Sequence, residues 1–180
     1  MADVRGQAEA LTVLTPIIRG RERELAAALV SLPTGPESPL ARLPGTHFGR
    51  WVIAPDLDPD ASYLLFSTTF DVGPTDYIDE IRKRMPDEAD SIWSHCDEYP
   101  GSRDPAAFKR YMERHRVRTS LFVAAYPNAS LPTVLEAIDW RRRLTELAPR
   151  AQHLDAEALQ AAFRDAFRSG RTETALGSPA

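Results

Sequence analysis

The sequence predicts an α+β protein with a ferredoxin-like βαββαβ order: a four-stranded antiparallel sheet with helices on one face, and extra C-terminal helices. Three observations lead to this fold class. β-rich apolar runs alternate with stretches of helical periodicity, and a short polar turn separates two of the runs. The chain has 180 residues, 43% of them hydrophobic, which suits one domain with a real core. The right-handed crossover rule places both helical connections on one face.

Four segments are predicted to be strands. Residues 10–18 (ALTVLTPII) are β-rich and end at a proline and a glycine. Residues 46–55 (THFGRWVIAP) and 63–70 (YLLFSTTF) flank the polar stretch DLDPDA, so we expect them to form an antiparallel hairpin. Residues 120–127 (SLFVAAYP) are predicted to be a buried fourth strand.

Helices are predicted where apolar residues recur every three or four positions. In residues 21–32 this pattern places Leu25, Leu29 and Leu32 on one face. Asp104 as N-cap and Pro105 at the first helical position mark the start of another helix. That helix spans residues 104–116, and the remaining predicted helices span residues 74–85, 87–96, 131–147 and 155–168. Residues 33–45 carry several prolines and are predicted to be a loop with room for one helical turn.

The predicted organisation is a ferredoxin-like domain over residues 8–150, an appended helix over 151–168 and a disordered tail over 169–180. The N-terminus lacks the apolar region of a secretory signal, and no apolar run approaches the roughly 18 residues of a membrane span. We therefore expect a cytoplasmic protein without membrane contact. A net charge of −4 and scattered arginines argue against nucleic acid, and "RRR" at 141–143 is interpreted as a solvated helix face.

The hairpin alternation sorts its side chains onto two faces. One set is largely apolar and suits a helix-covered core: His47, Gly49, Trp51, Ile53, Leu64, Phe66, Thr68 and Phe70. The other set mixes apolar and polar groups: Phe48, Arg50, Val52, Leu65, Ser67 and Thr69. Such a mixture suits a face that meets a partner sheet around a partly polar cavity, so a homodimer is expected. The alternative is a solvated face with a few stray apolar residues.

The element order and the mixed second face of the hairpin resemble the dimeric α+β barrel superfamily, over about residues 10–140. The strings THFGRWVI, YLLFSTTFDVG and IWSHCDEYPG are similar to a bacterial family loosely associated with haem peroxidases. The superfamily includes haem enzymes, such as chlorite dismutases and dye-decolourising peroxidases, and cofactor-free monooxygenases. The resemblance implies a small-molecule ligand, with haem as a cofactor and a peroxidase-like oxidoreductase activity. The Gly-x-x-Asp-Gly motif of dye-decolourising peroxidases is absent, and Phe70-Asp71-Val72-Gly73 is the nearest string.

A haem needs an axial imidazole beside a large apolar pocket and a polar group on the other side. His115 is the predicted metal ligand and catalytic residue, because it ends an apolar helical stripe formed by Phe108, Tyr111 and Met112. The alternative for His115 is a histidine buried against the core with a hydrogen-bond partner. His95 is a second candidate ligand, or else a cap at the C-terminus of its helix.

Trp93 and Tyr111 are predicted to contact the cofactor, in a pocket shared with Trp51 and Phe66. Arg50 is the second predicted catalytic residue, able to bind a carboxylate substrate or a haem propionate. Its alternative is a structural salt bridge with Asp71 or Glu136. His47 begins a strand and could point into a cavity. Cys96, the only cysteine, is expected to be an inert core residue, because acidic residues and a helix C-terminus surround it.

Three functions remain open from the sequence. The first is a small-molecule enzyme or binding protein of the α+β barrel type, with a pocket into which His115 or His95 faces. The second is a non-catalytic dimerising accessory module, whose histidines are paired within the protein. The third is a cofactor-free oxygenase or isomerase with a histidine base, in which a histidine and Arg50 converge.

Overall fold

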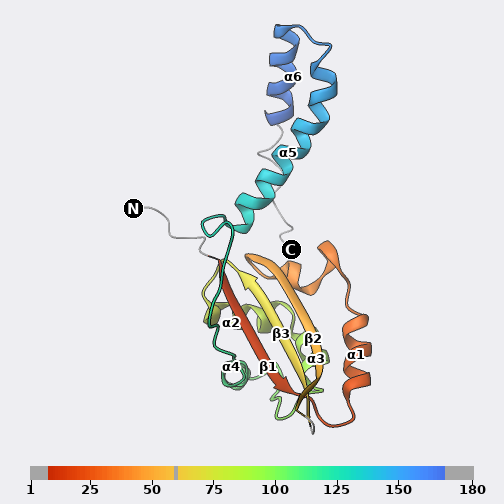
Figure 1. Cartoon of the computed structure of the whole chain (residues 1–180), viewed down its shortest axis with the longest axis vertical. Coiled ribbons are helices and arrows are strands. Elements are labelled where there is room, and N and C mark those ends of the chain that lie inside the picture. The colour runs from red at the N-terminus through yellow and green to blue at the C-terminus, as the bar shows by residue number, and fades with distance from the viewer. Residues whose placement is uncertain (1–7, 59–60, 169–180) are drawn as a thin grey trace. The chain divides into compact units, whose positions relative to one another are not determined.

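The computed structural model describes residues 8–58 and 61–168, with the backbone alone described for residues 55–58. The chain divides into two compact units, Met1–Leu131 and Pro132–Ala180 (Figure 1). The first unit holds the sheet and its helices, and the second holds a helical hairpin. The predicted tail over 169–180 lies outside the described residues.

The first unit contains an antiparallel sheet of three strands: β1 (Glu9–Pro16), β2 (Thr46–Asp58) and β3 (Ala61–Phe70), in the order β1-β3-β2. β2 and β3 form the predicted hairpin, with Trp51 opposite Phe66. β1 pairs with the other edge of β3, with Val13 also opposite Phe66. Phe66 therefore lies on the central strand, between side chains of both neighbours.

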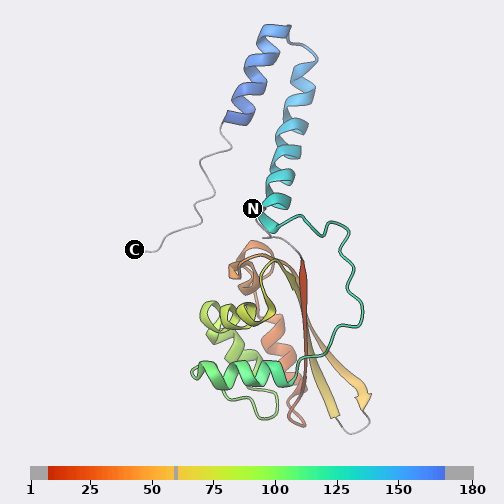
Figure 2. The same ribbon diagram turned by 90° about the vertical axis from the view of Figure 1, so that its left-hand side faces the viewer.

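The helices of this unit cover one face of the sheet (Figure 2). They are α1 (Glu22–Val30), α2 (Pro74–Arg84), α3 (Pro86–Trp93) and α4 (Pro105–Arg114). The last three begin with proline, whose missing N–H is not needed at that position. Asp104 caps α4, since its carboxylate accepts from the N–H groups of Ala106 and Ala107. The proline-rich stretch forms two short 3-10 turns, Gly35–Glu37 and Pro39–Arg42.

Aromatic side chains fill the space between sheet and helices. Trp51 stacks on Phe66 with ring centroids 5.1 Å apart, and Trp93 meets the same ring edge-on at 5.5 Å. Tyr77 of α2 stacks on Phe70 at 3.8 Å. On β3 the core-facing Leu64, Phe66, Thr68 and Phe70 are buried, and on β2 Trp51 and Ile53 are partly buried against them, as the alternation predicted. The predicted division of the hairpin into two faces is therefore confirmed.

The predicted four-stranded ferredoxin-like sheet is wrong: within the described ranges the sheet has three strands, and residues 120–127 form none. The segment that follows α4 starts to pair with β1: the Leu14 N–H donates to the His115 carbonyl, and the Val117 N–H donates to the Thr12 carbonyl. No further pairing with β1 follows among the described residues. The Val13–Arg116 bridge sets a register in which Arg118 would come opposite buried Leu11, and the chain leaves the sheet after Val117. Side chains that bury apolar surface hold an edge strand in place, and the charged residues 116 and 118, both exposed, supply none.

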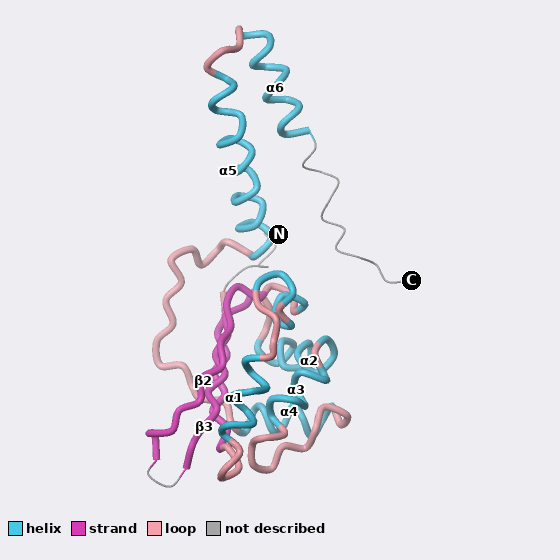
Figure 3. Tube along the Cα trace, turned by 90° about the vertical axis from the view of Figure 1, so that its right-hand side faces the viewer, coloured by secondary structure: helices cyan, strands magenta, loops and turns pink. Residues whose placement is uncertain are grey.

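The second unit is a hairpin of two helices, α5 (Leu131–Ala151) and α6 (Ala156–Arg168) (Figure 3). α5 extends past its predicted end at residue 147 and includes Pro149 in its last turn. Asp155 caps α6, because its carboxylate accepts from the Ala158 N–H at 2.8 Å. Trp140 of α5 stacks on Phe167 of α6 with ring centroids 4.3 Å apart.

Candidate functional site

A histidine–carboxylate pair lies where β2 begins and β3 ends. His47 Nε2 is 2.6 Å from Asp71 Oδ1, and the two side chains are 14% and 9% exposed. The second carboxylate oxygen accepts from the Leu131 N–H at 2.5 Å. The backbone N–H of Asp71 donates to the Gly45 carbonyl at 3.1 Å. One aspartate therefore ties β2, the end of β3 and the last residue of the first unit together.

A chain of hydroxyl groups lies at the same end of the sheet. The Tyr77 hydroxyl is 2.8 Å from Thr46 Oγ1 and 3.1 Å from Thr68 Oγ1. Thr68 Oγ1 donates to the Phe48 carbonyl at 2.9 Å, so it receives its other hydrogen bond from Tyr77. Burial raises the pKa of Tyr77, so this phenol stays protonated and serves as a hydrogen-bond donor.

An imidazole held by a buried carboxylate is the arrangement that general bases use. It is equally a structural tie, because both groups need partners once they leave water. Sequence reasoning noted His47 and Asp71 separately and missed their pairing. A signal was present: in a hairpin, the start of one strand and the end of the next lie at the same end of the sheet, and Thr46 is indeed opposite Phe70.

His115 lies at the C-terminal cap of α4 and is half-buried. Its Nδ1–H donates to the Tyr111 carbonyl at 2.9 Å, and its ring lies 4.5 Å from the Tyr111 ring between centroids. The stripe that precedes it, Phe108, Tyr111 and Met112, is buried as its periodicity predicts. The bond fixes the tautomer and leaves Nε2 available to a ligand.

His95 follows α3 and also binds the protein itself. Its Nδ1–H donates to the Ile92 carbonyl at 3.2 Å, and its Nε2 lies 3.8 Å from a Glu24 carboxylate oxygen. A hydrogen bond from Arg21 holds the pKa of that exposed carboxyl below its usual value. His95 therefore sits between the end of α3 and the start of α1.

Trp93 is the last residue of α3 and Tyr111 belongs to α4, and both side chains are buried in the core. Burial raises the pKa of the Tyr111 phenol, which remains protonated. Cys96 is buried beside them, and burial raises the pKa of its thiol to about 11. Thr15 Oγ1 donates to its sulfur at 3.3 Å. A neutral thiol in this setting agrees with the expected inert cysteine.

Arg50 lies on the other face of the sheet, opposite Ser67 of β3, and is exposed. Its guanidinium forms no hydrogen bond or ion pair with any residue that the structure describes. Asp71, one of its two expected partners, binds His47 instead. The sheet separates Arg50 from Trp93 and Tyr111, so the residues predicted for haem do not surround one space. A single haem that contacts all of them does not fit this arrangement.

The described residues also bring together no group of three or more His, Cys, Asp or Glu side chains that could hold a metal ion. Over residues 8–58 and 61–168, no helix combines the length and the apolar character needed to cross a membrane. Comparison with known proteins finds no matching family model, curated protein or solved structure.

Proposed function

We propose that this chain is a non-catalytic dimerising module that binds a second copy through the open face of its three-stranded sheet. The observation that carries the proposal is that helices cover one face only (Figure 2). The other face presents Phe48, which is 78% exposed, and, four residues further along β2, exposed Val52 in a row with half-buried Leu65 and Leu14. An exposed phenylalanine within an apolar group of this kind is typical of a contact surface.

The histidines support a structural rather than a catalytic role. His47, His95 and His115 each use a ring nitrogen within the protein. Arg50 does not converge with any of them, whereas an oxygenase or isomerase of the type considered needs a histidine and Arg50 in one pocket. A dimerising module needs no such convergence.

The composition of the open face favours a second copy as its occupant. Thr12, Ser67 and Thr69 intersperse hydroxyl groups among the apolar side chains, and Arg50 adds an exposed guanidinium. Such a mixture keeps a separate chain in solution and still packs on association, and arginine is enriched at protein interfaces. Two copies can pack their open faces against each other about a two-fold axis. Their sheets would then lie about 10 Å apart, as stacked sheets in proteins do.

The loop between α4 and α5 adds apolar surface on the same side. Figures 2 and 3 show it running on the side of the sheet opposite the helices. Leu121, Val123 and Tyr126 of this loop are exposed. Covering them against a second copy would remove them from water.

Sedimentation analysis of the full chain over a concentration series tests the proposal. We expect a dimer, and we expect Phe48→Asp to raise its dissociation constant by at least about tenfold, because a carboxylate would be buried in an apolar contact. Val30→Asp is the matched control, since Val30 is exposed on α1, away from the open face. A monomeric wild type, or a Phe48→Asp dimer as tight as the Val30→Asp dimer, would contradict the proposal.

A further inference from the structure

The connection between α4 and α5 contains a segment that joins no sheet in its own chain. Within the described ranges, no backbone group of residues 118–125 has a hydrogen-bond partner. Leu121, Val123 and Tyr126 are 77% to 81% exposed. We call residues 121–126 the linking segment. Both its backbone groups and its apolar side chains are left to water in a single copy.

The composition of the linking segment suits a strand that is covered on both sides. In an extended chain Leu121 and Val123 point to one side, and Phe122 and Ala124 point to the other. Both sides are therefore apolar, which is typical of strands buried on both faces. Its own β1 offers no such cover, since the chain leaves β1 after Val117.

β2 has an unpaired edge of matching chemistry. It is an outer strand in the order β1-β3-β2, and Figure 3 views the molecule from that edge. Outside its pairing with β3, β2 forms no backbone–backbone hydrogen bond in the described ranges. Gly49 and Arg50 are exposed, and the core-facing Trp51 and Ile53 are only partly buried, whereas Phe66 on β3 is buried. A long apolar strand with such an edge is a template for another strand.

The directions of the strands identify a second copy as the partner. β1 and β2 both run antiparallel to β3, and the chain after α4 runs antiparallel to β1. Figure 2 shows this chain leaving β1 on the open side of the sheet. When two open faces stack about a two-fold axis along the strands, the β1 edge of each copy lies over the β2 edge of the other. The linking segment then runs antiparallel to the partner's β2.

The chain is long enough to cross to the partner's sheet. Stacked sheets lie about 10 Å apart, and residues 118–120 span that distance at about 3.3 Å each. Thr12, which binds Val117, lies at the same level of the sheet as Arg50. The linking segment therefore runs beside the partner's β2 from the level of Arg50 toward the start of that strand.

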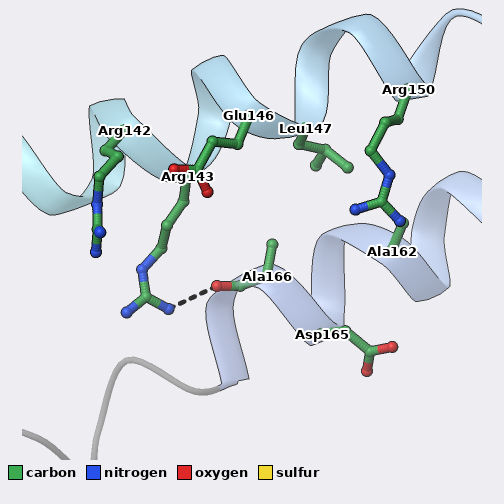
Figure 4. A pocket seen from close by; sticks show the side chains of 8 residues that line it. All are labelled: Arg142, Arg143, Glu146, Leu147, Arg150, Ala162, Asp165 and Ala166. Atoms are coloured by element: carbon green, nitrogen blue, oxygen red, sulfur yellow. Dashed lines mark hydrogen bonds between the residues drawn. The ribbon is translucent and has the colours of Figure 1, made fainter.

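The chain returns to its own copy directly after the linking segment. The Leu131 N–H donates to Asp71 at the end of β3. Residues 127–131, at about 3.3 Å each, span about 16 Å, enough to recross the gap between the sheets. α5 and α6 are then joined within the chain, because Arg143 donates to the Ala166 carbonyl (Figure 4). Only the linking segment and its two short crossings are therefore exchanged.

The apolar surface that this arrangement covers approaches that of a specific dimer. An aromatic side chain buries about 150–250 Å² when fully covered. Phe48, Phe122 and Tyr126, which are 78%, 39% and 78% exposed, therefore still present roughly 400 Å². Leu121 and Val123 bring the total per copy toward the roughly 800 Å² per partner of a standard interface.

We propose that two copies exchange their linking segments, so that each segment pairs antiparallel with β2 of the other copy. The two-fold axis forms this pairing twice. The pairing gives the backbone groups of the segment hydrogen-bond partners and covers apolar side chains of both strands. The added strand lies beside β2 and belongs to another chain, so the arrangement is not a ferredoxin-like sheet. This inference rests on the proposed function, because it requires the two open faces to meet.

Amide hydrogen exchange of the full chain, measured by mass spectrometry above and below the dimer dissociation constant, tests the pairing. In the dimer, amides of residues 121–126 should exchange at least about tenfold more slowly than in the monomer. Residues 152–155, an exposed connection in the other unit, are the internal control and should exchange equally in both states. A dimer whose linking segment exchanges as fast as in the monomer would overturn the inference and leave the contact between open faces standing. A monomeric wild type would remove the proposed function and the inference with it.

Paired substitutions separate strand pairing from side-chain burial alone. Phe122→Pro/Val123→Pro removes two successive N–H donors, one of which faces the partner's β2 in either register. Phe122→Ala/Val123→Ala is the matched control, since it truncates the same side chains and keeps both donors. The dissociation constant of the proline variant should be at least about tenfold higher than that of the alanine variant. Equal constants, with both variants folded by circular dichroism, would contradict the pairing.

Discussion

The imidazole of His47 and the carboxylate of Asp71 meet 2.6 Å apart at one end of the hairpin, and both are almost fully buried. Asp71 also accepts the Leu131 N–H, so both of its oxygens are used. A carboxylate that leaves water needs such partners, because an unpaired buried charge costs several kcal/mol. This pair therefore fixes the point where β2, β3 and the end of the first unit converge.

Replacing Asp71 with alanine should destabilise the protein by about 3 kcal/mol, because it leaves the His47 ring and the Leu131 N–H without their partner. Urea unfolding followed by circular dichroism measures the loss. A double-mutant cycle with His47→Ala should give a coupling energy of roughly 1–3 kcal/mol. A coupling near zero would show that the two side chains do not stabilise each other.

Gly45→Ala should destabilise the fold more than Gly20→Ala. Both glycines have positive φ, at 68° and 88°, which side chains disfavour by roughly 1–2 kcal/mol. A Cβ on Gly45 would also come within 3.1 Å of the Asp71 backbone nitrogen and Cβ, whereas a Cβ on Gly20 meets open space. Thermal unfolding of the two variants compares them directly, and equal losses would contradict crowding at Asp71.

Stability should fall at alkaline pH because of Cys96. Its pKa is about 11 in the folded protein, above the usual 9.0, so the unfolded chain loses this proton first as pH rises. The unfolded state is thereby favoured between pH 9 and 11, by up to about 3 kcal/mol. Cys96→Ala should remove this part of the pH dependence, together with the part by which the Cys96 thiolate raises the pKa of Tyr99 and Tyr111. Urea unfolding at pH 8 and pH 10.5 gives the difference, and parallel losses in the two proteins would contradict it.

Asp90 should be a strong stabiliser of the loop between α3 and α4. Its carboxylate accepts from the Tyr99 hydroxyl at 2.8 Å, the Ser102 N–H at 2.7 Å and the Ser102 hydroxyl at 2.9 Å. Asp90→Ala should cost about 2–4 kcal/mol, since it leaves three donors unsatisfied. Ser102→Ala removes one of the three bonds and should cost about 1 kcal/mol. If chemical denaturation shows equal losses for the two variants, the carboxylate does not organise this loop.

Local patterns predicted most of the elements. Proline and the aspartate at position 104 marked the starts of helices, and the polar stretch after residue 55 placed the hairpin. Period-two alternation also sorted Trp51 and Phe66 from Arg50 and Ser67 correctly. Each of these features depends on residues that are close together in the sequence or joined by one hairpin turn. The local sequence pattern is therefore enough to predict it.

The fourth strand could not be judged in the same way. Residues 120–127 have the composition of a buried strand, yet β propensity describes how a residue fits a half-buried surface. Whether that surface exists depended on the register at Val13–Arg116, which brings charged rather than apolar residues opposite Val13 and Leu11. A tertiary register of this kind is absent from the local pattern.

The candidate site shows the same division. The sequence determined which residues carry chemistry, and the stripe that ends at His115 was predicted correctly. Tertiary structure alone decided that His47 rather than Arg50 holds Asp71. The reason is physical: periodicity fixes the side of an element on which a residue lies, whereas the pairing of two distant residues depends on how whole elements pack and where charges find partners.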